Sequence, residues 1–97
     1  MRIALIEPDL RHATLVGRLI FAGGHACQHF IASAPFLHRA ADEFFDLLIT
    51  ESWAGDHCAE DVIPRARAIL PDLPVIVLLP EPRESQIVIL LVVSLAI

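Results

Sequence analysis

Carboxylates follow two short apolar runs of the sequence, and their spacing is the first feature that suggests chemistry. Glu7 and Asp9 come just after the run Ile3-Ala4-Leu5-Ile6, and Glu51 follows the run Leu47-Leu48-Ile49-Thr50. Runs this short, between turn-prone flanks, are typical of buried strands rather than helices. Because ligands bind at the carboxyl ends of strands in open parallel sheets, we expect these acids to share one edge of a sheet.

Other polar side chains give weaker signals of chemistry. His25, Cys27 and His29 alternate and would share one face of a strand, as zinc ligands could, but no second pair of ligands completes a site. His57 and Cys58 are adjacent, and no third residue is identifiable that would orient them as base and nucleophile. Strand packing and a loop thiol are the simpler interpretations. We therefore expect no metal site and no enzymatic activity.

The composition of the 97 residues predicts one small soluble domain, spanning residues 1–97. A net charge of -5, with seven scattered basic residues, gives no footprint for nucleic acid or for an anionic membrane. Neither a signal peptide nor an apolar run long enough to cross a bilayer is found, so we expect a cytoplasmic protein. An apolar content of 56% is above the usual range of roughly 45 to 50%, which favours apolar surface covered by a partner.

Strands and helices alternate along the chain. We expect strands over 3–6, 26–31, 47–50 and 75–79, and helices over about 10–22, 33–42 and 60–70. Asp9 and Ser33 are the expected N-caps, and Pro64 should delay or kink the third helix. The expected core stripe of the first helix is His12, Leu15, Val16, Leu19 and Ile20, and Gly23-Gly24 should end that helix. This alternation predicts an α/β fold with a parallel sheet and right-handed crossovers.

The order of these elements, with acids after the first and third strands, resembles the receiver domain of two-component response regulators. The matching segments are Arg2 to Asp9, Ala22-Gly23-Gly24-His25, Phe45 to Glu51, and Asp72 to Leu78. The resemblance implies a flavodoxin-like three-layer sandwich with sheet order 2-1-3-4, without the family's fifth strand and fifth helix. It also implies a role in phosphorelay signal transduction, in which an aspartate accepts a phosphoryl group from a histidine kinase.

Several positions depart from the pattern of that family. Glu51 occupies the phosphoacceptor position, and its extra methylene displaces the oxygen that phosphoryl transfer needs in line. Glu7 matches the first acid of the family's pocket, with Asp9 as a further remnant, but Pro8 replaces the metal-ligating acid. Proline offers no side-chain oxygen, so no cofactor is expected and magnesium binding is not predicted. Leu79 replaces the family's switch hydroxyl, and the sequence contains no lysine.

The tail over 83–97 stands in place of the family's fourth helix and is almost wholly apolar. We expect it to be helical, with a strand as the alternative that its β-branched residues favour. The fourth strand would then be an exposed apolar edge, and one face of the sheet would be covered by the first helix alone. Hydrophobic burial then predicts a homodimer or larger assembly through residues 75–97. The expected interface residues are Val75, Val77, Leu79, Ile87, Leu90, Leu91 and Leu95.

These observations predict an atypical receiver domain that is not phosphorylated and that acts through protein partners, including itself. Two interpretations of Glu51 stay open: a fixed mimic of phosphoaspartate, or a remnant without a signalling role. Two alternatives for the whole chain also stay open. The first is a conventional receiver that uses a displaced acid such as Asp9 or Asp56, and the second is a fragment of a longer regulator.

Overall fold

The computed structural model describes residues 1–80, 87–88 and 93–94 of the chain. The elements, in chain order, are β1 (Arg2–Ile6), α1 (Leu10–Ala22), β2 (Ala26–Phe30), α2 (Ser33–Ala40), β3 (Leu47–Glu51), α3 (Ala59–Ile69), β4 (Val75–Pro80), β5 (Ile87–Val88) and β6 (Val93–Ser94). The four longer strands and three helices lie where the sequence predicted them, with bounds that shift by one or two residues.

The four longer strands form a parallel sheet in the predicted order β2-β1-β3-β4. In register, Ile6 of β1 lies opposite Phe30 of β2 and Thr50 of β3, and Glu51 lies opposite Leu78 of β4. Because all four strands run the same way, the loops that follow β1, β2 and β3 gather at one edge of the sheet. The flavodoxin-like α/β architecture predicted from the sequence is confirmed.

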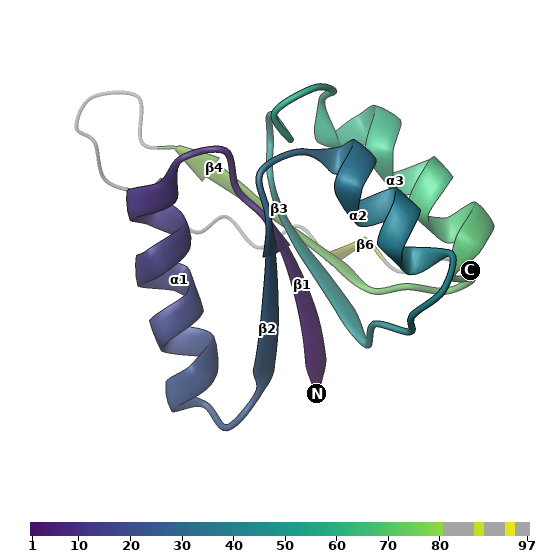
Figure 1. Ribbon diagram of the computed structural model, residues 1–97. Helices are drawn as coiled ribbons and strands as arrows, with labels where there is room; N and C mark the ends of the chain where they lie inside the picture. The colour runs from purple at the N-terminus through teal and green to yellow at the C-terminus, as the bar shows by residue number, and fades with distance from the viewer. Residues whose placement is uncertain (81–86, 89–92, 95–97) are drawn as a thin grey trace.

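The sheet separates two apolar cores, and Figure 1 shows α1 on one face with α2 and α3 on the other. The larger core packs α2 and α3 against the sheet and contains Phe30, Phe36 and Phe45, whose ring centroids lie 5.6 to 6.1 Å apart. The smaller core packs α1 against Ile3, Leu5, Ile49 and Leu78. The described helices thus cover the second face with α1 alone, as the sequence predicted.

The core stripe predicted for α1 is only partly right. Ala13 and Ile20 are buried against the sheet, with Val16 partly buried between them. Leu15 and Leu19, which the prediction placed in the core, are 55% and 60% exposed. Because the helix turns its Ala13–Val16–Ile20 line to the sheet, Leu15 and Leu19 fall on a flank that no neighbouring described helix covers.

The ends of α1 and α3 test the caps and breaks predicted from the sequence. Asp9 caps α1 as predicted, since its Oδ1 accepts hydrogen bonds from the backbone N–H groups of Arg11 and His12 at 2.9 and 3.4 Å. The helix ends at Gly23, and the left-handed conformation falls on Gly24, with a φ of 84°. Of the two alternatives predicted for α3, the late start is wrong, because the helix begins at Ala59. Pro64 lies inside the helix with its side chain exposed.

The described part of the tail corrects two expectations. Residues 87–88 and 93–94 are short strands rather than a helix. They pair antiparallel with β4, placing Val88 opposite Leu79 and Ser94 opposite Val75. The prediction that the β4 edge is exposed is therefore wrong at these positions, because backbone groups of an unpaired edge are satisfied here by the chain's own tail.

The same pairing narrows the predicted interface. Val75 is fully buried in the larger core, so it is withdrawn from the interface residues. Val77 and Leu79 are partly buried. Ile87 belongs to β5, and Leu90, Leu91 and Leu95 lie outside the described residues, so those four positions remain predictions.

Candidate functional site

The acids predicted to share one edge of the sheet come from its two central strands. Glu51 is the last residue of β3, and Glu7 follows the last residue of β1. Since Ile6 and Thr50 are partners in the parallel register, the next residue along each strand lies beside the other. Both side chains are buried, with Glu7 2% and Glu51 9% exposed. The structure thus brings two carboxyl groups together in a site with little access to water.

Glu7 is held by groups from β2 and from the loop between β1 and α1. Its N–H donates to the carbonyl oxygen of Phe30 at 3.0 Å, and its own carbonyl accepts from Nε2 of His29 at 2.7 Å. Its Oε2 accepts the N–H of Asp9 at 3.1 Å. Its Oε1 is buried and has no hydrogen-bond donor, and Nδ1 of His12 lies 3.8 Å away on the first turn of α1. Of the two Glu7 carboxylate oxygens, Oε2 therefore accepts a hydrogen bond and the buried Oε1 does not.

Glu51 responds to this environment with a raised pKa. Burial is the largest cause, and a hydrogen bond with the Glu7 carboxyl and the negative charge of Glu7 add to it. The N–H of Ser52 acts in the opposite direction, and the pKa of Glu51 rises from 4.5 to about 7. Near neutral pH, the two carboxyl groups therefore do not both carry a full negative charge.

The remaining pocket positions do not add ligands for a hard cation. Pro8 is exposed and has no side-chain oxygen. Asp9 is also exposed and caps α1. The N–H groups of Arg11 and His12, which donate to its carboxylate, lower the pKa of Asp9. Leu79 pairs with Val88 and is partly buried, so the end of β4 presents a methyl-bearing side chain in place of a hydroxyl.

Magnesium, which the receiver resemblance implies, does not fit this pocket. It prefers octahedral oxygen coordination, usually with carboxylates and several waters. Here the residue after Glu7 is a proline, and the third acid, Asp9, caps a helix. In the part of the chain that the structure describes, no three histidine, cysteine or acidic side chains form a group that could hold a metal.

The loop after β3 contains an anchor that the sequence did not reveal. Asp56 accepts hydrogen bonds from the N–H and hydroxyl of Ser33 and from the N–H of Ala34 at 2.9, 2.6 and 3.0 Å. Burial alone would raise the pKa of Asp56, but these donors lower it well below its usual range. Ser33 is thus the first residue of α2 rather than its predicted cap, and Asp56 caps the helix from another loop.

Gly55 fixes the position of this anchor. It adopts a φ of 85°, and a Cβ at this position would lie 2.4 Å from the carbonyl oxygen of Ile31. Only glycine allows the β3–α3 loop to approach the β2–α2 loop this closely. No local pattern in the sequence signals this contact, because its two halves are more than 20 residues apart.

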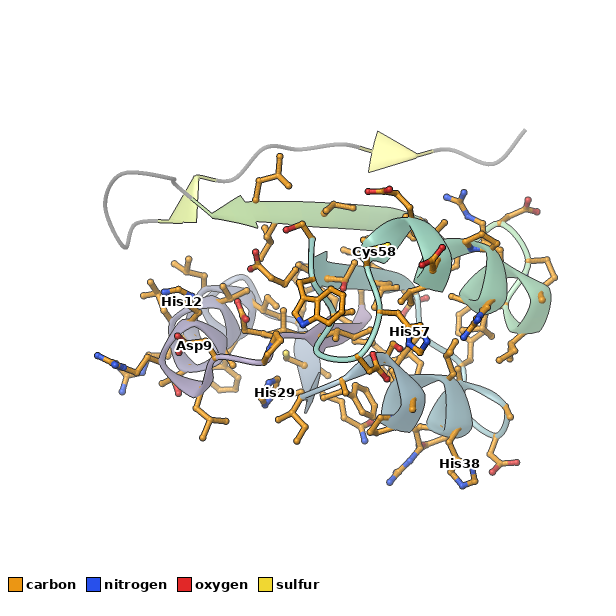
Figure 2. All side chains as sticks on the ribbon, turned by 90° about the horizontal axis from the view of Figure 1, so that it is seen from above. Asp9, His12, His29, His38, His57 and Cys58 are labelled. Carbon is orange, nitrogen blue, oxygen red and sulfur yellow. The ribbon has the colours of Figure 1, made fainter. Side chains whose placement is uncertain are left out.

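The weaker candidates from the sequence have other partners. His25 Nδ1 lies 2.9 Å from the N-terminal amine, while Cys27 is exposed on the outer strand. Cys58 donates to Asp61 at 3.1 Å, an interaction that raises its pKa, whereas His57 Nδ1 lies 3.6 Å from Asp56. Viewed from above in Figure 2, His57 and Cys58 lie on the α2 and α3 side of the sheet, across from Asp9 and His12 at α1.

The parallel sheet, the α-helical layers on both faces and the carboxyl pair at the C-terminal edge of β1 and β3 define an α/β domain of the flavodoxin-like class. No protein-family model matches the sequence, and no curated protein matches it either. None of the helices in residues 1–80 is long and apolar enough to span a bilayer.

Solved structures of receiver domains are similar to this chain in fold. The receiver domain of the hybrid histidine kinase CckA superposes with a TM-score of 0.73 at 23% identity, over 79% of this chain and 73% of that one. A CheY-like receiver domain from Methanospirillum hungatei JF-1 gives 0.76 at 16% identity, over 82% and 64%. A transiently phosphorylated switch of bacterial signal transduction gives 0.68 at 18%, over 78% and 61%.

The chain therefore has the fold of a CheY-like response regulator receiver domain, as the sequence predicted. It spans less than two thirds of the length of two of these three structures.

Proposed function

We propose that this chain is an atypical receiver domain of two-component phosphorelay signalling that acts by binding proteins and is not switched by phosphorylation. The observation that carries the proposal is the contact between Glu7 and Glu51. A phosphoacceptor must be an ionised carboxylate that is open to an incoming phosphoryl group and to its metal. Here the carboxyl group at that position is buried against a second acid, and its pKa is about 7.

The alternative of a displaced phosphoacceptor has less support. Asp9 is engaged with the first turn of α1, and Asp56 is engaged with the first turn of α2. Phosphorylation of either residue would remove a helix cap, which typically stabilises a protein by about 1 kcal/mol. Neither acid belongs to the buried pair of Glu7 and Glu51.

The surface of α1 supports a protein-binding role. Its exposed apolar side chains are Leu10, Leu15, Leu19 and Phe21, all at least 55% exposed. The helix carries Arg11 and Arg18 and no acid, although the whole chain has a net charge of -5. Leu15 and Leu19 are four residues apart and therefore share one flank of the helix, and adjoining exposed apolar residues are typical of protein contact surfaces.

Phosphoryl analogues test the proposal directly. Beryllofluoride or acetyl phosphate is added with magnesium, and the fluorescence of Trp53 is followed, since this side chain is 55% exposed and lies two residues beyond Glu51. We expect no saturable change in the wild type. The matched comparison is Glu51→Asp, which restores the acid of conventional receivers at the same position. A saturable response of the wild type would contradict the proposal.

Solution mass measures the proposed self-association. Sedimentation at micromolar concentration should give a dimer or larger species, and Leu79→Arg should shift it toward monomer if contacts through 75–97 hold the assembly. Leu15→Arg is the control for association through α1, where the side chain is 55% exposed. A compact and stable wild-type monomer would exclude self-association. Loss of assembly only in Leu15→Arg would place the contact on α1 instead.

Mutation of Glu51 separates the two interpretations of this residue, a mimic of phosphoaspartate or a remnant without a signalling role. If the buried carboxyl holds the domain in one binding state, Glu51→Ala should change partner binding or assembly. If Glu51 is a remnant, both properties stay as in the wild type. The half-buried Leu79 at the end of β4 favours the remnant, because it offers no hydroxyl to contact the carboxyl group.

A further inference from the structure

The outer side of β2 is an open edge of the sheet. Among the described residues β2 is the end strand and pairs only with β1, and Figure 1 shows α1 and α2 on its two faces. The N–H of Ala26 donates inward to the carbonyl oxygen of Met1 at 3.0 Å, and the carbonyl oxygen of Phe30 accepts inward from the residue after β1 at 3.0 Å. Because backbone groups alternate along a strand, the N–H and C=O groups of Cys27 and His29 point outward.

Strand β2 has none of the features that block open edges in proteins. Charged residues, proline and bulges serve that purpose. The sequence Ala26–Phe30 contains no acid, lysine, arginine or proline, and its register with β1 is unbroken. At the other end of the described sheet, β4 is paired with β5 and β6. Among the described residues, β2 is therefore the longer strand whose outer side is open and unprotected.

The flank of α1 on the β2 side is uncharged and partly apolar. Leu10 and Phe21 on this flank are 66% and 79% exposed. By helical spacing they lie opposite His12, which Figure 2 places on the side of α1 nearer β4, so they face the β2 side. Thr14 and Gly17 lie on the same line between them. Two copies of a chain with a net charge of -5 can meet on this surface without bringing like charges together.

We propose that β2 pairs antiparallel with β2 of a second copy of this chain and so joins two sheets into one. Cys27 lies opposite His29 of the second copy, and each such pair exchanges both of its outward backbone hydrogen bonds. Gln28 lies on the two-fold axis, opposite the same residue of the second copy. A two-fold contact requires a surface that is complementary to itself, and this register meets that requirement because Cys27 and His29 are equally distant from Gln28.

The α1 flank has the same symmetry, which favours a second copy over an unrelated strand. Leu10 and Phe21 are placed symmetrically about the middle of the flank, as are Thr14 and Gly17. The middle of the flank lies about 10 Å above the α1–β2 turn at 1.5 Å per residue, and Gln28 lies at about the same height at 3.3 Å per residue. One axis therefore serves both elements, and it brings Leu10 of each copy toward Phe21 of the other.

This inference rests on the proposed function in one respect, that the chain binds a copy of itself. It goes beyond that function by placing the contact on β2, at the opposite edge of the described sheet from residues 75–97, and by giving its register.

Cys27→Pro tests the pairing by sedimentation at micromolar concentration under reducing conditions. Proline at an edge position whose N–H faces outward removes no hydrogen bond of the single copy, so the variant should fold. Its mass should be about half that of the wild type, because the contact between two copies is lost. Cys27→Ser is the matched control, since it removes the thiol, keeps the N–H and should associate like the wild type. Phe21→Arg should weaken association by roughly tenfold and serves if Cys27→Pro does not fold.

Gln28→Cys tests the register, in a background that carries Cys27→Ser and Cys58→Ser. A residue opposite its own counterpart in such a pair has its Cα about 4.5 Å from that counterpart, within the range that a disulfide spans. Oxidised glutathione should therefore produce a covalent dimer. Ala26→Cys in the same background is the matched control, because its two thiols would be about 13 Å apart along the strands and should not cross-link.

Variants at the two edges separate this inference from the function on which it rests. Association that survives Cys27→Pro and Phe21→Arg, with no cross-link through Gln28→Cys, would overturn the β2 contact. If Leu79→Arg alone abolished association, the contact through 75–97 would be supported and the β2 contact overturned. Loss in Cys27→Pro alone, with the cross-link formed, would support the β2 contact and contradict the contact through 75–97. A stable wild-type monomer would overturn both.

Discussion

The carboxylate of Asp56 holds the hydroxyl and the N–H of Ser33 at 2.6 and 2.9 Å, and so ties the β3–α3 loop to the start of α2. The Oδ2 atom of Asp56 takes the next N–H of the helix, at Ala34. A single side chain therefore satisfies backbone donors that a helix normally leaves to its own N-cap residue. Ala32, which stands at that N-cap position, has no side chain that could do so.

Asp56→Ala should lower the free energy of unfolding by about 1 to 2 kcal/mol, the usual cost of losing an N-cap. Urea denaturation measures this change. Asp42→Ala is the matched control, because Asp42 is an exposed aspartate in the turn after α2. Equal effects of the two variants would mean that the Asp56 contacts contribute no specific stability.

Gly55→Ala should destabilise the domain, because its Cβ would meet a backbone oxygen at 2.4 Å and its φ of 85° is strained for alanine. Gly17→Ala should have the opposite effect and stabilise by roughly 0.5 to 1 kcal/mol, since Gly17 lies inside α1 and no atom lies within 4 Å of the place that a Cβ would take. Thermal unfolding measures both effects: the Tm should fall in Gly55→Ala and rise in Gly17→Ala. A neutral Gly55→Ala would show that the two loops can separate without cost.

The stability of the domain should fall as the pH rises through the titration of Glu51. The folded pKa of about 7 lies above the ordinary 4.5, so the folded state holds a proton that the unfolded state releases between these values. The loss in the free energy of unfolding grows across that pH range and is complete above pH 7, with an upper bound of about 3 kcal/mol. Glu51→Gln should remove this component, so its gain over the wild type is larger at pH 8 than at pH 5.

Denaturant unfolding of both proteins across this pH range measures the difference between them, which cancels the shared titration of the histidines. Glu60→Gln, an exposed substitution on α3, is the control and should track the wild type. A pH-independent difference between Glu51→Gln and the wild type would contradict the raised pKa.

Substitutions on the buried face and on the exposed flank of α1 should differ strongly in their effect on the free energy of unfolding. Ile20→Ala should destabilise by about 2 to 4 kcal/mol because this side chain is buried in the smaller core. Leu19→Ala, one residue earlier, should change stability by less than about 0.5 kcal/mol because Leu19 is 60% exposed. Chemical denaturation of monomeric protein makes the comparison. A large cost for Leu19→Ala would show that its side chain is covered in solution.

The periodicity of short apolar runs and the turn residues between them determined the four parallel strands and three helices. Strands such as Val75–Pro80 and the cap at Asp9 depend on neighbours in sequence, and these local signals proved correct. The position of Glu51 at a strand end also followed from local pattern, because a carboxylate after a buried run must lie at the sheet edge.

The tertiary structure decided what the local signals could not. Leu19 and Ile20 are both apolar, and only the orientation of α1 on the sheet made one exposed and the other buried. The Asp56 cap on Ser33 and the pairing of β4 with the tail join residues far apart in sequence. The contact of Glu7 with Glu51 arises for the same reason: strand register placed two acids 44 positions apart side by side, and burial of Glu51 beside Glu7 raises the pKa of Glu51.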